Sequence, residues 1–134
     1  MNGSRLLIAD DDADYRAWLS HHLEQAGYEV MTAADGLEAL SQVQVERPDL
    51  VLLDALMPRM DGFDVLARLK SDPATAAIPV VMFTGMPAEA REYTAVYGPG
   101  EFYVSDTIAL VVIKPLLKDP AVLIRAIAEL TAGN

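Results

Sequence analysis

The chain has 134 residues, of which 52% are hydrophobic, and its formal net charge is −10 at pH 7. This size and apolar content are those of one globular domain, so we expect a single domain over residues 1–134, and the absence of cysteine excludes disulfide and thiolate chemistry. The acidic balance argues against direct nucleic-acid binding, which needs clustered lysine and arginine, and favours cations and basic protein surfaces as partners.

The N-terminal segment begins with a short apolar run that ends in acids. Only about five apolar residues precede the acidic ones, too few for a signal peptide or a membrane span. We therefore expect a cytoplasmic protein without membrane insertion. Residues Arg5–Ala9 predict a buried strand, followed by Asp10, Asp11 and Asp12. Either Asp11 or Asp12 is placed to cap the next helix, which extends to about Gln25.

Strand and helix patterns then alternate to the end of the chain. Further strands are predicted at 28–33, 50–53, 80–83 and 109–113, and further helices at 35–46, 63–69 and 120–132. Five strands alternating with helices predict an α/β fold, a doubly wound parallel sheet with helices on both faces.

The strand at 50–53 is an unbroken apolar run, typical of a strand buried on both faces, and it ends abruptly in Asp54. Ligands of open α/β sheets bind at the carboxyl ends of the strands, which makes Asp54 a candidate site residue. An isolated aspartate at this position more often ends a strand or caps a helix. The turn signals Met57-Pro58 and Asp61-Gly62 instead indicate a structured loop beside the carboxylate.

Polar residues follow other predicted strands as well. Asp10 and Asp11 follow the first strand, Thr84 the fourth and Lys114 the fifth. The carboxyl ends of parallel strands meet at one edge, so we expect these residues to face one crevice with Asp54. Carboxylates for a hard cation, a hydroxyl donor and an ammonium group are the components of a divalent-metal and phosphoryl site.

This ordered set resembles the receiver domain of two-component response regulators, of the chemotaxis-regulator type, over nearly the whole chain. The matching motifs are the acidic pair after LLIA, then LLDALMPRMDG, FTG and IKP. The resemblance implies a flavodoxin-like sheet of five parallel strands in the order 2-1-3-4-5. It also implies a signalling phosphoacceptor in a phosphorelay, which is not an enzyme beyond catalysing its own phosphorylation and slow dephosphorylation.

The resemblance implies a role for each site residue. Asp54 is expected to accept a phosphoryl group from a histidine kinase or phosphotransfer protein. Asp11, Asp54 and the backbone carbonyl of Leu56 are expected to hold Mg²⁺, with Asp10 helping through water. Thr84 is expected to hydrogen-bond the phosphoryl group and Lys114 to pair with it. Phosphorylation would then switch a surface for a downstream protein target, and a homodimer is common in this family.

The segment between Thr84 and Lys114 departs from the family pattern. Val111 stands where an aromatic residue is usual, and valine cannot make the rotamer change that accompanies switching. The interval is also longer than usual, by roughly a short hairpin, with a strong turn signal at 98–100. Residues 102–104 read as an extra short strand or an extended flap. The aromatic residues of this atypical segment form either a specialised partner surface or ordinary packing: Tyr93, Tyr97, Phe102 and Tyr103.

A second departure concerns the lifetime of the phosphorylated state. Leu56 and Met86 stand two residues after Asp54 and Thr84, at positions that flank the phosphoryl group in this family. Both side chains are apolar and neither can orient a water molecule by hydrogen bonding. We therefore expect slow self-dephosphorylation.

Two alternative functions remain open at this point. The first is a non-phosphorylated pseudo-receiver that acts only as a protein-interaction module. The second is a Mg²⁺-dependent phosphohydrolase in which Asp10 and Asp12 are nucleophile and general acid, although the chain has no spare length for a substrate cap. The chain either acts alone or is a fragment of a larger regulator.

Overall fold

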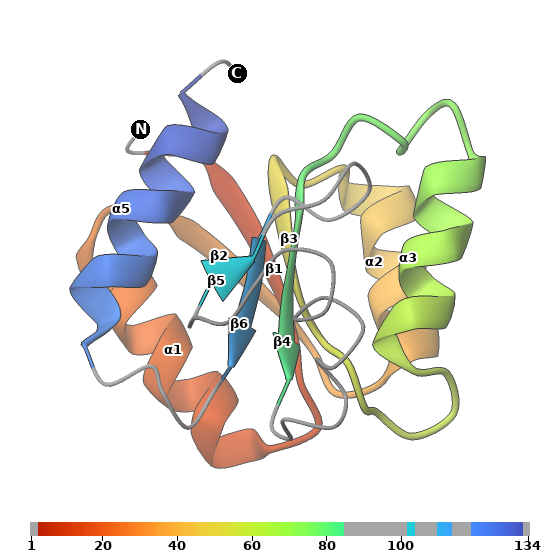
Figure 1. Ribbon diagram of the computed structural model, residues 1–134, viewed down its shortest axis with the longest axis horizontal. Helices are drawn as coiled ribbons and strands as arrows, with labels where there is room; N and C mark the ends of the chain where they lie inside the picture. The colour runs from red at the N-terminus through yellow and green to blue at the C-terminus, as the bar shows by residue number, and fades with distance from the viewer. Residues whose placement is uncertain (1–2, 85–101, 104–109, 114–118, 133–134) are drawn as a thin grey trace.

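A β-sheet runs through the middle of the molecule and carries helices on both faces (Figure 1). The computed structural model describes residues 3–84, 102–103, 110–113 and 119–132. The strands are β1 (Arg5–Ala9), β2 (Glu29–Ala33), β3 (Leu50–Asp54), β4 (Val80–Thr84), β5 (Phe102–Tyr103) and β6 (Leu110–Ile113). The helices are α1 (Ala13–Gln25), α2 (Gly36–Glu46), α3 (Gly62–Ser71) and α5 (Pro120–Thr131).

The strand order in the sheet is β2-β1-β3-β4-β6-β5. Neighbours from β2 to β6 are parallel, which confirms the predicted flavodoxin-like parallel sheet flanked by helices. The sheet differs from the expected five strands because the two-residue strand β5 pairs antiparallel with β6. It uses backbone groups that β6 would otherwise expose at the sheet edge. Of the two readings of this segment, the short strand is therefore observed at residues 102–103, and residue 104 lies outside the described residues.

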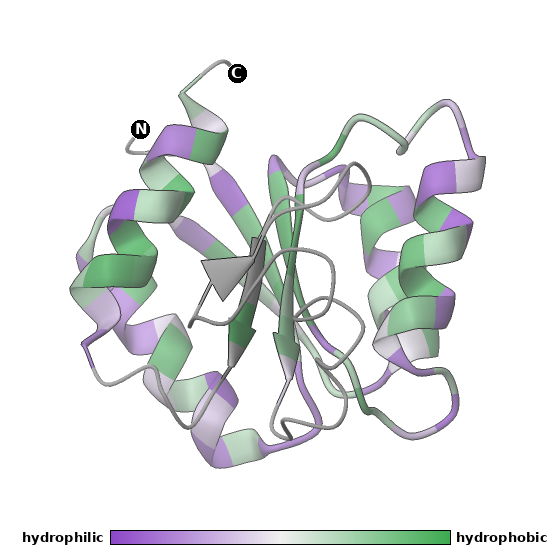
Figure 2. Cartoon of the chain, in the orientation of Figure 1, coloured by the Kyte–Doolittle hydropathy of each residue, from purple (hydrophilic) through white to green (hydrophobic). Residues whose placement is uncertain are grey.

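Each face of the sheet packs against a different pair of helices. Helices α1 and α5 cover one face, and α2 and α3 cover the other (Figure 1). The side chains of β3 alternate between the two cores, with Leu50 and Leu52 on the α1–α5 side and Val51 and Leu53 on the α2–α3 side. All five residues of β3 are buried, as the unbroken apolar run predicted. Hydrophobic residues accordingly dominate the central strands (Figure 2).

An aspartate caps the N-terminus of each helix in the described part of the chain. Asp12 caps α1, Asp35 caps α2, Asp61 caps α3 and Asp119 caps α5, each accepting hydrogen bonds from backbone N–H groups of the first turn. The caps explain why the predicted helix starts agree closely with the observed ones. None of the helices in this part of the chain has the length and apolar character that crossing a bilayer requires.

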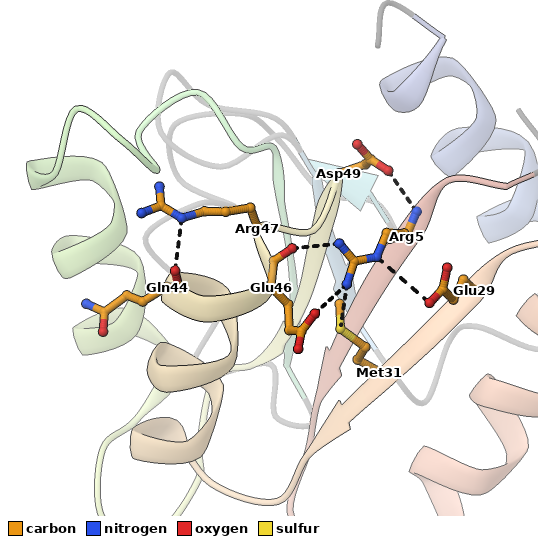
Figure 3. Close-up of polar contacts among 7 residues, drawn as sticks. All are labelled: Arg5, Glu29, Met31, Gln44, Glu46, Arg47 and Asp49. Atoms are coloured by element: carbon orange, nitrogen blue, oxygen red, sulfur yellow. Dashed lines mark hydrogen bonds and ion pairs between the residues drawn. The ribbon is translucent and has the colours of Figure 1, made fainter.

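Arg5 ties several elements together at the amino ends of the strands (Figure 3). Its guanidinium donates to the backbone oxygen and to the carboxylate of Glu46 at the end of α2, both at 2.7 Å. Its backbone N–H donates to the carboxylate of Asp49, just before β3, at 2.8 Å. Glu29 of β2 lies 3.9 Å from the guanidinium. These contacts hold the amino ends of the strands in place. The candidate site lies at the carboxyl ends of the same strands.

Candidate functional site

Three carboxylates meet at the carboxyl ends of β1 and β3. Asp10, Asp11 and Asp54 each offer an oxygen, and these oxygens all lie within 4.8 Å of one another. Asp10 and Asp54 are almost fully buried, at 2% and 7% exposure, whereas Asp11 faces solvent. The sequence prediction that these three residues share one place is therefore correct.

The pairing of β1 with β3 explains this meeting. Ala9 is the register partner of Leu53, so the residues that follow them, Asp10 and Asp54, emerge side by side. Side chains alternate along a strand, and Ile8 and Leu52 belong to the core under α1 and α5. Asp10 and Asp54, two residues further on, therefore point toward that same face of the sheet.

The turn between β1 and α1 holds the Asp10 carboxylate in place. Its Oδ1 accepts a hydrogen bond from the backbone N–H of Asp12 at 2.9 Å. The Arg16 guanidinium donates to the Asp10 backbone oxygen at 2.6 Å. Asp12 itself turns its carboxylate toward α1, where it accepts from the N–H groups of Asp14 and Tyr15. Asp12 is thus the helix cap, which leaves Asp11 as the third carboxylate of the cluster.

The loop after β3 is held close to the Asp54 backbone. The backbone N–H of Ala55 donates a hydrogen bond to the backbone oxygen of Phe83 at 2.7 Å, and the Ala55 carbonyl accepts one from the N–H of Gly62 at 2.9 Å. A Cβ on Gly62 would collide with the backbone oxygen of Asp54, so the start of α3 can approach this closely only with glycine. Leu56 lies in this loop with its side chain 55% exposed.

A contact between two loops supports the same edge of the sheet. Arg59, whose φ of 70° is left-handed, places its guanidinium 3.5 Å from the Asp35 carboxylate that caps α2. A Cβ on Gly36 would collide with the backbone of Met60. The loop that follows Asp54 is therefore packed against the start of α2 as well as that of α3.

Tyr15 borders the carboxylate cluster and was missed by sequence reasoning. Burial raises the pKa of its phenol well above the usual range, and the charges of Asp10 and then Asp54 raise it further. Its ring packs edge-on against Phe83 of β4 with 5.9 Å between ring centroids. The signal in the sequence was its place three residues after the cap Asp12, which puts it in the first turn of α1.

Of the other predicted site residues, Thr84 lies within the described part of the chain and Lys114 does not. Thr84 ends β4, is buried, and follows Phe83, the register partner of Asp54, so it lies at the same sheet edge. Lys114 follows β6 in the sequence but lies outside the described residues, as do Met86, Tyr93 and Tyr97. Val111 pairs with Met82 within the sheet. The calls on Lys114, on Met86 and on the partner surface remain predictions.

The donor set of the cluster suits a hard divalent cation. Three carboxylates whose oxygens lie within 4.8 Å of one another repel, and a bound cation would offset that repulsion. Carboxylate oxygens are the ligands that Mg²⁺ and Ca²⁺ prefer, and Mg²⁺ usually keeps several waters and uses few protein carboxylates. The partly exposed position of the cluster, with Asp11 open to solvent, leaves room for such waters.

Comparison with known proteins gives a consistent result. Residues 6–102 match the family model of the response regulator receiver domain. The probable transcriptional regulator ycf27 of Cyanophora paradoxa is 38% identical over 104 residues, which are 78% of this chain and 42% of that protein. The response regulator PleD of Caulobacter vibrioides is 46% identical over 84 residues, which are 62% of this chain and 18% of that protein.

Similarity extends to solved structures. The chemotaxis response regulator CheY4 of Vibrio cholerae superimposes with a TM-score of 0.74 at 31% identity, over 96% of this chain and 99% of that chain. The chain spans less than half the length of the curated relatives that it matches.

Proposed function

Because this chain belongs to the response regulator receiver family of two-component signalling, we propose that it is a phosphoacceptor whose switch is the phosphorylation of Asp54. The observation that carries the proposal is the meeting of Asp10, Asp11 and Asp54 at the carboxyl ends of two neighbouring strands. The phosphoryl donor is a histidine kinase or a phosphotransfer protein, and the target is a further protein.

In this proposal Asp54 is the nucleophile. A carboxylate oxygen attacks the phosphorus atom of the donor, and the bond from phosphorus to the donor's leaving atom breaks as the new oxygen–phosphorus bond forms. Mg²⁺, when bound, neutralises the oxygens of the cluster and of the phosphoryl group. Asp11, Asp54 and the Leu56 backbone carbonyl would hold the ion, and Asp10 would hold one of its waters.

The remaining groups act on the transferred phosphoryl group. The Thr84 hydroxyl would donate a hydrogen bond to one of its oxygens, and the Lys114 ammonium would pair with another. Lys114 follows β6 in the sequence, β6 pairs parallel with β4, and we therefore expect Lys114 at the same end of the strands as Asp54. The tightly packed loop from Ala55 to Gly62 keeps the Asp54 backbone fixed while charge accumulates there.

A pseudo-receiver that is never phosphorylated is the second candidate, and the presence of Val111 in place of an aromatic favours it. The buried pair Asp10 and Asp54 weighs against it, since two buried carboxylates side by side repel each other and a bound cation would offset that repulsion. The phosphohydrolase reading has less support. Its general acid would be Asp12, whose carboxylate caps α1.

The proposal is tested by intact-mass measurement after incubation with acetyl phosphate and Mg²⁺. We expect a gain of about 80 Da that requires Mg²⁺ and is absent from Asp54→Ala. Asp49→Asn is the matched control, because Asp49 lies just before the other end of β3 and its carboxylate accepts from the Arg5 backbone N–H; it should be phosphorylated like the wild type. A folded wild type that gains no phosphoryl group would favour the pseudo-receiver, and steady turnover of a generic phosphomonoester would favour the hydrolase.

A further inference from the structure

We propose that the Tyr15 hydroxyl is an additional hydrogen-bond donor of the phosphoryl site, which reaches it from α1 instead of from a strand end. The inference rests on the proposed function and deepens it, because it adds a residue that stabilises the phosphorylated state. Three independent features of the structure support it: the face on which the ring lies, the hydrogen bonds that fix its backbone, and the charges around it.

The ring of Tyr15 lies on the sheet face toward which Asp54 points. Phe83 is the register partner of Asp54 in the neighbouring strand, and its side chain belongs to the core under α1 and α5. Tyr15 packs edge-on against this Phe83 ring, with an interplanar angle of 76°. Asp54 follows Leu52 of the same core by two residues, so Tyr15 and Asp54 occupy neighbouring positions on one face.

The backbone of Tyr15 is tied to the carboxylate cluster. Its N–H donates to Oδ1 of Asp12 at 3.2 Å, and the N–H of Asp12 donates to Oδ1 of Asp10 at 2.9 Å. The next residue, Arg16, donates to the Asp10 backbone oxygen. The first turn of α1 and the Asp10 carboxylate are thus one hydrogen-bonded unit, which sets the position of the Tyr15 ring relative to the site.

The Tyr15 hydroxyl lies beside two acceptor side chains. Asp10 and Asp54 are close enough for their charges to act on it. A protonated phenol can donate one hydrogen bond, and the carboxylates around it can only accept. A phosphoryl group on Asp54 adds further charged oxygens at the same place, so the hydroxyl gains acceptors when the site is occupied.

The Tyr15 hydroxyl should therefore contribute to the affinity for a phosphoryl group and contribute little to the affinity for a cation alone. A hydrogen bond to a charged acceptor strengthens binding by about tenfold or somewhat more. Cation binding alone depends on the carboxylates and should change little when the hydroxyl is removed. The effect of losing the hydroxyl should therefore appear in the affinity for a phosphoryl group and not in the affinity for Mg²⁺.

The test compares Tyr15→Phe with wild type, using beryllofluoride as a stable mimic of the phosphoryl group. Phenylalanine keeps the ring that packs on Phe83 and Trp18 and removes only the hydroxyl. Trp18 is the single tryptophan of the chain, and its ring centroid lies 5.6 Å from that of Tyr15, so its fluorescence provides a signal close to the site. The matched control is Tyr28→Phe, which alters a buried tyrosine of the core against which Tyr15 packs.

We expect Tyr15→Phe to weaken beryllofluoride binding at saturating Mg²⁺ by about tenfold, with the Mg²⁺ affinity within about twofold of wild type. Tyr28→Phe should leave both affinities unchanged. The rise in melting temperature caused by beryllofluoride gives a second measurement that does not depend on fluorescence, and it should be smaller for Tyr15→Phe than for both other proteins.

Equal beryllofluoride affinity in Tyr15→Phe and wild type would overturn the inference and leave the proposed function standing. An equal loss of Mg²⁺ and beryllofluoride affinity would also overturn it, because it would show that Tyr15 only supports the fold of the cluster. Failure of the wild type to bind beryllofluoride or to gain a phosphoryl group would instead refute the proposed function itself.

Discussion

Asp10 accepts a 2.9 Å hydrogen bond on its carboxylate from the backbone N–H of Asp12. This contact gives three consecutive aspartates different roles. Asp10 is oriented into the cluster, Asp12 turns away to cap α1, and Asp11 is the exposed member of the cluster. A local turn of the chain therefore decides which acids belong to the carboxylate cluster and which one stabilises a helix.

Removing one carboxylate should stabilise the protein when no Mg²⁺ is present. In Asp54→Asn the repulsion with Asp10 and Asp11 is relieved, and we expect the free energy of unfolding in urea to rise by about 1 kcal/mol. Adding Mg²⁺ should stabilise the wild type and reduce this difference, because the cation offsets the same repulsion. Asp49→Asn serves as control and should show no stabilisation. A mutant less stable than wild type without Mg²⁺ would contradict this account.

The two glycines that begin α2 and α3 should differ in their effect on phosphorylation. Gly36→Ala and Gly62→Ala both force a Cβ into neighbouring backbone, and we expect each to lower stability by about 2 to 3 kcal/mol. Only Gly62 abuts the Asp54 backbone, so only Gly62→Ala should also slow phosphorylation by acetyl phosphate, by about tenfold or more. Urea denaturation and the rate of mass gain measure the two effects. Equal phosphorylation rates in the two variants would argue against a positioning role for Gly62.

Leu56 should prolong the phosphorylated state. Its exposed apolar side chain stands two residues after Asp54 and cannot orient an attacking water molecule. We expect Leu56→Asn to speed loss of the phosphoryl group several-fold, and Leu56→Ile, which keeps the apolar character, to behave like wild type. The decay of the phosphorylated mass after removal of the donor measures the rate. If Leu56→Asn decays no faster than Leu56→Ile, water orientation at this position does not set the lifetime.

The contacts that Arg5 makes with Glu46 and Glu29 should affect stability without affecting the carboxylate site. Arg5→Ala removes two hydrogen bonds to Glu46 and the ion pairs with it and with Glu29, and because these groups are partly exposed we expect a loss of about 1 kcal/mol. Arg5→Lys should recover part of that loss. Phosphorylation by acetyl phosphate should proceed as in wild type, since the Arg5 contacts lie at the amino ends of the strands and the carboxylate cluster lies at their carboxyl ends. A slower reaction in Arg5→Ala at unchanged folding would show that the two edges are coupled.

Much of the fold could be predicted because local signals agree with the overall arrangement. The apolar run before Asp54 marks a strand buried on both faces, and Asp35 marks the start of α2. The convergence of Asp10 and Asp54 then follows from parallel pairing of their strands. Contacts between distant segments carry no such local signal. The packing of Tyr15 on Phe83 and the close approach of Gly36 to Met60 depend on how helices settle on the sheet, which single-residue patterns do not encode.

The sequence was also ambiguous where two roles suit the same residue type. Asp11 and Asp12 are equally good helix caps by composition, and only the turn geometry assigns the cap to Asp12. Residues 102–104 suited a strand or a flap, and pairing with β6 shows a strand at residues 102–103. The pairing of β5 with β6 joins segments that are separated in the sequence, and the cap depends on the geometry of a local turn that residue types alone do not specify.

The most direct test of the central claim is to locate the phosphoryl group. Reducing the phosphorylated protein with borohydride converts an aspartyl phosphate to homoserine, and peptide mass analysis then identifies the position. The proposal predicts homoserine at position 54 after incubation with acetyl phosphate and Mg²⁺, and none when Mg²⁺ is chelated. Homoserine at position 10 or 11, or a wild type with no trapped residue, would contradict it.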